Sequence, residues 1–207
     1  MKRRIIVITA ILAFVGICSV SWTLVSRAAY ESAAYEVVQS DGEFEIRRYP
    51  DLMLATTATK LDRQGRDGSF MRLFQFISGE NESKQKISMT TPVFIEEESE
   101  KTAGSMGFVM PQSVADQGVP KPLSQGVKLR QRKGGRFAVV RFSGKLDRTR
   151  SDEYELNLRE WMQSRGLVGE EIAEAAGYDP PFTPGPLRRN EVLIRIKALS
   201  QDAEPTT

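Results

Sequence analysis

Carboxylates, lysines and tyrosines are the residues of this chain that could carry acid–base chemistry. The sequence contains no histidine, and its single cysteine, Cys18, lies in an apolar N-terminal stretch. A Ser-His-Asp triad, a cysteine nucleophile in the folded part and the usual structural zinc sites are therefore excluded. General acid or base work would fall to Asp, Glu, Lys or Tyr.

The acidic residues occur in two settings. The densest run, residues 96–100, lies between two apolar segments. We interpret it as a solvated loop, since carboxylates in a flexible run are rarely preorganised for a metal. Glu45 and Glu191 stand inside strand-like segments and alternate with residues expected to face inward, so we predict that both face solvent. This pattern offers no carboxylate directed into a pocket, and we expect a protein that is not an enzyme and has no metal site.

Two amphipathic helices should hold the domain together. Phe70, Leu73, Phe74 and Ile77 follow helical spacing, with Ser69 as a possible N-cap. A second helix is predicted from Ser151 to about residue 165, and its inward stripe comprises Tyr154, Leu158, Trp161 and Met162. Strand-like segments flank both helices at residues 52–59, 87–95, 137–142 and 191–197. Periodicity alone therefore predicts an α+β domain.

Composition is that of one soluble domain. Hydrophobic residues make up 40% and charged residues 27% of the chain, and the net charge is +2. The charges are mixed along the length, without the basic stripe of a nucleic-acid-binding surface, so we expect no nucleic-acid partner. We place the domain at residues 30–198, followed by a flexible tail at 199–207.

We predict that residues 1–29 are an N-terminal transmembrane anchor or signal segment. Three cations, Lys2, Arg3 and Arg4, precede an uncharged stretch at residues 5–25. This stretch is long enough to cross a bilayer, and the cations favour an inner-membrane, single-pass protein with its domain outside the cytoplasm. Small residues at 26–29 leave the alternative of a cleaved signal, which would give a periplasmic or secreted protein.

Several motifs in one order resemble the SOUL family. They are YEVV at 35–38, FEIRRY at 44–49, KISMTTPV at 86–93, MGFVMP at 106–111, AGYDPP at 176–181 and RNEV at 189–192. The resemblance implies two βαββ repeats with pseudo-twofold symmetry, forming a distorted antiparallel barrel flanked by two helices. It also implies a strand at residues 170–176, where the Glu and Ala content alone favours a helix. We follow the family there.

The resemblance further implies a haem or tetrapyrrole ligand beside the first helix. Phe70, Met71, Phe74 and Ile77 would form the apolar wall, although at helical spacing Phe70, Phe74 and Ile77 are more often ordinary core. Lys60, Arg63 and Arg66 could meet the propionates, although a solvated loop is the alternative.

The iron ligand is the point at which the sequence departs from part of the family. Some members have a histidine that aligns with Arg48, and a guanidinium cannot ligate iron. The axial candidates implied here are Tyr49, Met53, Met71 and Met89, each of which also suits a packing role. We therefore expect binding through an apolar groove and basic residues, with porphyrin held about as well as haem.

The function expected from these observations is an exported, membrane-anchored binding protein for haem or a related tetrapyrrole. Two alternatives stay open. One is a small-molecule-binding or hydrolytic protein of the gyrase-inhibitor-like type, which the same doubled βαββ architecture resembles. The other is an envelope scaffold without a ligand.

Overall fold

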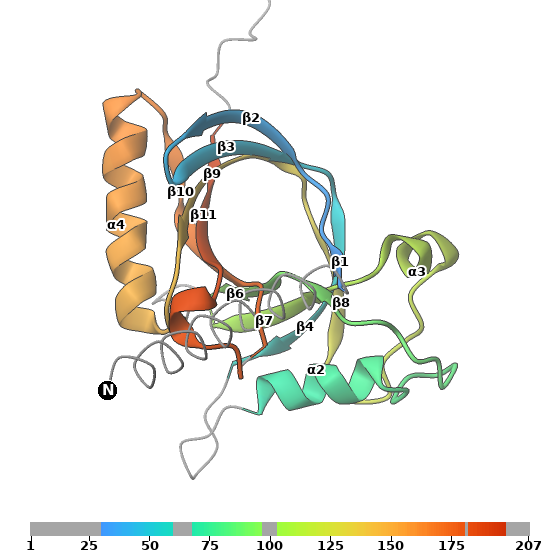
Figure 1. The fold of residues 1–207 in the computed structure, drawn as a ribbon. Helices are drawn as coiled ribbons and strands as arrows, with labels where there is room; N and C mark the ends of the chain where they lie inside the picture. Colours follow the sequence, from blue (N-terminus) through green and yellow to red (C-terminus); the bar gives the residue numbers. More distant parts are fainter. Residues whose placement is uncertain (1–29, 60–67, 97–102, 181, 198–207) are drawn as a thin grey trace, which may run out of the picture.

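The computed structural model describes residues 30–59, 68–96, 103–180 and 182–197 (Figure 1). Its strands are β1 (Glu31–Ser32), β2 (Glu36–Asp41), β3 (Phe44–Tyr49), β4 (Leu52–Ala58), β5 (Thr90–Thr91), β6 (Val93–Glu96), β7 (Ser105–Val109), β8 (Lys128–Arg132), β9 (Gly135–Phe142), β10 (Gly169–Gly177) and β11 (Asn190–Ile196). Its helices are α2 (Ser69–Ile77), α3 (Gln112–Gln117), α4 (Arg148–Ser164) and the 3₁₀ helix η1 (Gly185–Leu187).

One large antiparallel sheet dominates the fold, which confirms the predicted α+β class. Nine strands pair in the order β2-β3-β9-β11-β10-β6-β7-β4-β8, and the sheet curls strongly on itself (Figure 1). Across the described residues the edge strands β2 and β8 are not paired with each other, so the expected barrel is not closed. A register shift between Val37 and Gln39 interrupts the pairing of β2 with β3, and such a bulge increases the local twist of the strand.

The same connectivity occurs twice within the sheet. In β4-α2-β6-β7 the first strand pairs with the last, and the last pairs with the middle one. In β9-α4-β10-β11 the pairing follows the same order. The two middle strands, β10 and β6, join the units to each other. This arrangement gives the sheet an inner concave face and an outer face that the helices cover.

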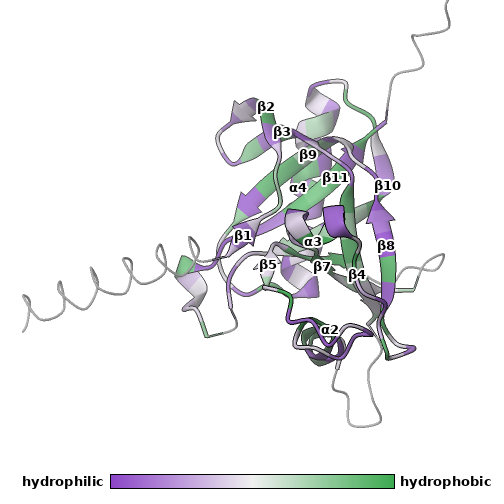
Figure 2. Ribbon diagram, turned by 90° about the vertical axis from the view of Figure 1, so that its right-hand side faces the viewer, coloured by the Kyte–Doolittle hydropathy of each residue, from purple (hydrophilic) through white to green (hydrophobic). Residues whose placement is uncertain are grey.

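Three apolar clusters fill the spaces on the two faces of the sheet. Leu54, Phe137 and Leu193 belong to the cluster inside the curl. Val192 and Ile194, on the outer face, pack with α4, and a third cluster lies between the sheet and α2. Apolar residues recur along β9 and β11 in Figure 2. Strand residues are therefore buried on both faces, so alternation does not by itself identify a solvent side.

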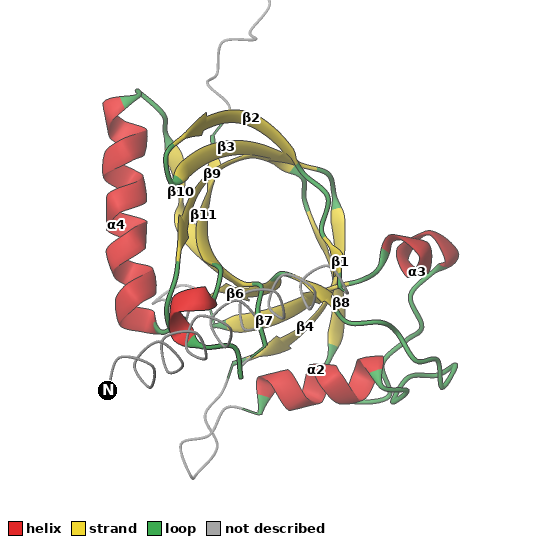
Figure 3. Ribbon diagram, viewed as in Figure 1, coloured by secondary structure: helices red, strands yellow, loops and turns green. Residues whose placement is uncertain are grey.

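Helix α4 begins earlier than its sequence pattern indicated. Asp147, not Ser151, is the N-cap, and its carboxylate accepts a hydrogen bond from the amide of Arg150 at 3.2 Å. Both residue types satisfy free amides at a helix start, so sequence alone did not separate them. The predicted inward stripe is confirmed, since Leu158, Trp161 and Met162 are buried. The helix lies on the outside of the sheet (Figure 3).

The ambiguous segment at residues 170–176 is a strand. It forms most of β10 and pairs with β11 on one side and with β6 on the other. Pairing on two sides outweighs the modest helix propensity of Glu and Ala. Within the described ranges no helix is both long and apolar enough to cross a membrane, and the predicted span at residues 5–25 lies outside those ranges.

Candidate functional site

One side of α2 carries three large apolar side chains that stay exposed. Phe70, Met71 and Phe74 are 40%, 55% and 45% exposed. The rings of Phe70 and Phe74 are nearly parallel, with centroids 6.2 Å apart, and Phe70 meets the buried ring of Phe108 edge-on at 5.3 Å. Large apolar side chains that stay exposed together are a typical mark of a binding surface. We call these three residues the α2 face.

The structure distinguishes the two interpretations of the helix. Ile77 is core, together with Leu73 and Phe76. The core interpretation is wrong for Phe70 and Phe74. Six of the nine residues of α2 are large and apolar. They extend around more of the helix circumference than one sheet face can cover. Helical spacing alone favoured Phe70 and Phe74 as buried residues, whereas Phe76 is the phenylalanine of α2 that is buried.

Two of the predicted iron-ligand candidates lie beneath α2. Met53 on β4 and Met89, just before β5, are half-buried and pack against the cluster between the sheet and α2. Thr90, next to Met89, donates a hydrogen bond from its hydroxyl to the carbonyl of Val109. Thr90 therefore has a structural role in this motif, while Met89 lies near the helix.

Arg48 and Tyr49 are not brought together with the α2 face. Tyr49 is buried in the cluster inside the curl, beside Leu54. Successive strand residues point to opposite faces, so Met53 faces α2 while Leu54 faces the interior. Tyr49 is thus on the wrong side of the sheet to meet a ligand on the α2 face. Arg48 is exposed, and its Nη1 lies 3.3 Å from Glu36 on β2. The predicted cations Lys60, Arg63 and Arg66 lie outside the described residues.

A second group of polar and charged side chains surrounds the buried carboxylate of Glu191. Its Oε2 accepts hydrogen bonds from Nη1 of Arg47 at 2.6 Å and from the hydroxyl of Tyr178 at 2.8 Å. Its Oε1 accepts from Nη2 of Arg47 at 3.0 Å and from Nε and Nη2 of Arg189 at 2.9 and 2.7 Å. We call Glu191, Arg47, Arg189 and Tyr178 the interior carboxylate cluster.

The prediction that Glu191 faces solvent is wrong. Glu191 and Arg47 are both fully buried, because the concave side of the curled sheet is an interior as well. Glu45 is also largely covered, and it forms ion pairs with Arg47 and Arg141. The sequence carried one signal for this pair, since Arg47 on one strand and Glu191 on another have opposite charges, as the two partners of an ion pair require.

Burial and the two arginines act in opposite directions on the pKa of Glu191. Burial raises it, but the hydrogen bonds and charges of Arg47 and Arg189 lower it more, so the pKa lies below its ordinary value. Burial also raises the pKa of Tyr178 well above its ordinary value. At neutral pH the cluster therefore holds an ionised, fully paired carboxylate beside a neutral phenol. Such a carboxylate is a weak base with no free lone pair directed at a substrate.

The lowered pKa predicts a specific acid sensitivity. A carboxyl whose pKa is depressed by folding stabilises the protein above its unfolded pKa, and this contribution is lost as the pH falls through the folded pKa. The stability difference between the unmodified chain and Glu191→Gln should therefore be full above about pH 5 and shrink below about pH 4. Urea unfolding of both proteins from neutral to acid pH checks this. A difference that stays constant would contradict it.

One known family matches almost the whole described region of the chain. The profile of the family described as "SOUL heme-binding protein" covers residues 30–195. The chain belongs to the SOUL heme-binding family. This SOUL protein is 29% identical to human "Heme-binding protein 2" over 174 residues, covering 80% of this chain and 81% of the human protein. It is 28% identical to the mouse protein of the same name over 159 residues, covering 72% and 77%.

Solved structures resemble this SOUL protein in fold. A hydrolase from Listeria innocua superposes with a TM-score of 0.55 at 12% identity, covering 77% of this chain and 94% of that one. The C-terminal domain of EcmrR gives a TM-score of 0.50 at 11% identity, covering 80% and 99%. At such identities the likeness concerns the α+β architecture alone, since sites rather than folds determine function.

Proposed function

We propose that this SOUL protein binds haem or a related tetrapyrrole against the α2 face, without a histidine ligand to the iron. The observation that carries the proposal is the exposure of Phe70, Met71 and Phe74 side by side on one helix. A flat macrocycle would cover all three, and burial of apolar surface contributes about 25 cal/mol per Å². Membership of a heme-binding family supports the ligand class.

The residues around α2 fit such a group in composition. The rings of Phe70 and Phe74 offer apolar contact to the macrocycle. Met71 is the exposed thioether on this face, and a thioether can ligate haem iron. Lys60 and Arg63 precede the helix in the sequence and would meet the propionates; this part of the proposal rests on sequence alone. We expect apolar contact to dominate, with or without iron.

A porphyrin titration tests the proposal. The full chain in a mild detergent is titrated with haemin and with iron-free protoporphyrin, and absorbance is followed against a detergent blank. We expect saturable binding of both at similar affinity. Phe74→Glu should weaken both by about tenfold or more, because it replaces apolar contact with a charge that the ligand would bury. Leu156→Glu, at a more exposed apolar position on α4, should change neither.

The other outcomes are equally informative. Tight binding of haemin alone would indicate an axial ligand and direct attention to the methionines near α2. Binding that Phe74→Glu leaves unchanged would place the ligand elsewhere. Binding of neither porphyrin would favour a scaffold without a tetrapyrrole.

We further propose that the protein is a binding module rather than an enzyme, anchored in the inner membrane through residues 5–25 with its domain outside the cytoplasm. The paired state of Glu191 supports the first point. The uncharged stretch behind Lys2, Arg3 and Arg4 supports the second. After extraction at alkaline pH, an anchored chain would stay in the membrane fraction and a cleaved chain would be released. In a separate test, protease added to spheroplasts would reach the domain only if the domain is exported.

A further inference from the structure

The loop that follows β10 carries the most exposed large apolar side chain of the described residues. Phe182 is 77% exposed, and Pro184 and Pro186, further along the same loop, are exposed as well. We call residues 182–188 the Phe182 loop. A single exposed apolar residue is common on a soluble domain, but an aromatic ring with so little cover, followed by two exposed prolines, forms an apolar tip.

Hydrogen bonds fix the backbone of the Phe182 loop. The residue after Phe182, Thr183, is 5% exposed. Its amide donates to the carbonyl of Pro180 at 3.0 Å, and its carbonyl accepts from Nε of Arg188 at 2.7 Å. The amides of Leu187 and Arg188 donate to carbonyls within the loop at 2.9 and 3.0 Å. Because these donors are paired and prolines have none, the loop can enter a poorly hydrated environment at reduced cost.

Cations surround the base of the Phe182 loop. The carbonyl of Gly185 accepts a hydrogen bond from the amide of Gly144 at 2.9 Å, which joins the loop to the turn before α4. In that turn Lys145 is exposed, and within the described ranges it has no carboxylate at ion-pair distance. Residues 143–150 and 179–188 together carry four cations, Lys145, Arg148, Arg150 and Arg188, against two carboxylates, Asp147 and Asp179.

The chain enters the domain at the end of the sheet that carries the Phe182 loop. β1 pairs with β5, and β6, which begins two residues after β5, pairs at Val93 with Gly177, the last residue of β10. The hydroxyl of Tyr35, just after β1, accepts a hydrogen bond at 3.1 Å from Nη2 of Arg189, just after the loop. Residue 30 and the Phe182 loop therefore lie at the same end of the sheet.

The predicted anchor ends close to this point in the sequence. Its uncharged stretch ends at residue 25, and residues 26–30, even when fully extended, span at most about 18 Å. The anchoring proposed above would therefore hold this end of the sheet near the bilayer surface.

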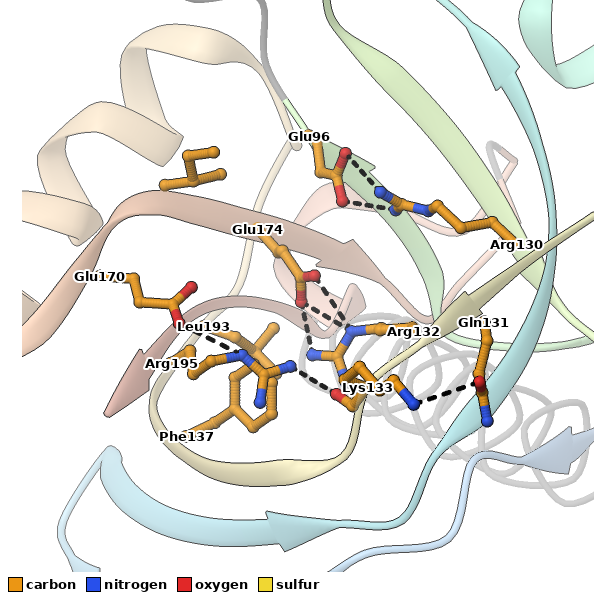
Figure 4. A pocket seen from close by; sticks show the side chains of 11 residues that line it. Glu96, Arg130, Gln131, Arg132, Lys133, Phe137, Glu170, Glu174, Leu193 and Arg195 are labelled. Atoms are coloured by element: carbon orange, nitrogen blue, oxygen red, sulfur yellow. Dashed lines mark hydrogen bonds and ion pairs between the residues drawn. The ribbon is translucent and has the colours of Figure 1, made fainter. Parts of the chain in front are cut away.

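The charged side chains toward the other end of the sheet pair with one another. Glu174 pairs with Arg132, and Glu96 pairs with Arg130 (Figure 4). Charges that neutralise each other in this way exert a weak field on their surroundings. This end is thus less suited to anionic lipid than the end with the Phe182 loop.

We propose that the Phe182 loop is the membrane-contacting surface of the domain, with the ring of Phe182 in the interfacial layer and the neighbouring cations on anionic head groups. An apolar side chain beside exposed cations is the combination with which proteins attach to anionic lipid surfaces. This inference rests on the proposed anchoring and is independent of the tetrapyrrole. A second attachment point would hold the domain in one orientation, which a single tether does not.

A fluorescent label at residue 182 tests the proposal. The full chain carrying Cys18→Ala and Phe182→Cys is labelled with NBD and reconstituted in lipid nanodiscs of phosphatidylcholine and phosphatidylglycerol. Lipids with a doxyl group quench only a label that lies in the bilayer. We expect these lipids to quench the label at residue 182 by about twofold or more.

The matched control places the same label at the opposite end. Val168 is 50% exposed, and its carbonyl accepts from the amide of Lys197, just after β11. The 17 residues of α4 separate it from the turn beside the loop by about 25 Å. The label in Val168→Cys should therefore not be quenched. Equal quenching at the two positions, or none at residue 182, would overturn the proposal.

A charge reversal tests the contribution of the cations. Lys145→Glu should reduce the quenching at residue 182 in discs that contain phosphatidylglycerol and leave it unchanged in discs of phosphatidylcholine alone. Quenching that is the same in both kinds of disc, with and without this substitution, would overturn the role of the cations. A chain that does not stay with the discs would remove the anchor and this inference together, whereas porphyrin binding to the α2 face is decided by its own titration.

Discussion

Glu191→Gln should lower the free energy of unfolding by about 3–5 kcal/mol, the usual cost of removing one partner of a buried ion pair. Glutamine can accept hydrogen bonds from Arg47 and Arg189, but it cannot neutralise them. Arg47 has a fully buried side chain, and without Glu191 its charge would be left with Glu45 alone, a carboxylate that Arg141 also shares. Urea unfolding at neutral pH measures the loss.

Glu36→Gln is the matched control. Glu36 pairs with Arg48 on the outer surface, where the side chains are 65% and 60% exposed. Water and salt screen such a pair, so its removal should have almost no effect on stability. Similar losses in the two variants would mean that burial of the pair is not what makes Glu191 important.

Phe76→Ala should destabilise the domain by about 3–5 kcal/mol through the cavity that it leaves. Phe76 is 1% exposed and belongs to the cluster that fixes α2 on the sheet. Phe74→Ala, two residues earlier, should cost less than about 1 kcal/mol, because much of its ring already faces water and alanine favours the helix. Thermal or urea unfolding of the two variants gives the comparison directly.

This pair of variants also tests the assignment of the α2 face. If Phe74 is kept for binding, Phe74→Ala should retain the fold while losing affinity for porphyrin. A large loss of stability in Phe74→Ala would show that Phe74 belongs to the core. The α2 face would then no longer include this ring.

Family motifs and periodicity together predicted much of the fold. Helical spacing identified the stripe of α4, since Leu158, Trp161 and Met162 repeat at intervals that only one helix face can satisfy. The motifs identified β10 as a strand against its local propensity. The start of α4 was missed because Asp147 and Ser151 are equally good caps. The barrel that the resemblance implied is not closed, because closure depends on whether two distant edge strands meet, and no local pattern encodes that.

The sequence by itself determined the chemistry that is available, because an absent histidine and a cysteine confined to the N-terminal stretch cannot be supplied by any fold. It also determined the class of the domain, since local periodicity selects helices and strands. Only the tertiary structure decided which side chains are inside. Curling of the sheet turned its concave side into a second interior, which buried Glu191 and Arg132, while α2 turned Phe76 inward and left Phe70 and Phe74 exposed. Burial of this kind depends on contacts between distant strands, and alternation along one strand is the same whichever face becomes covered.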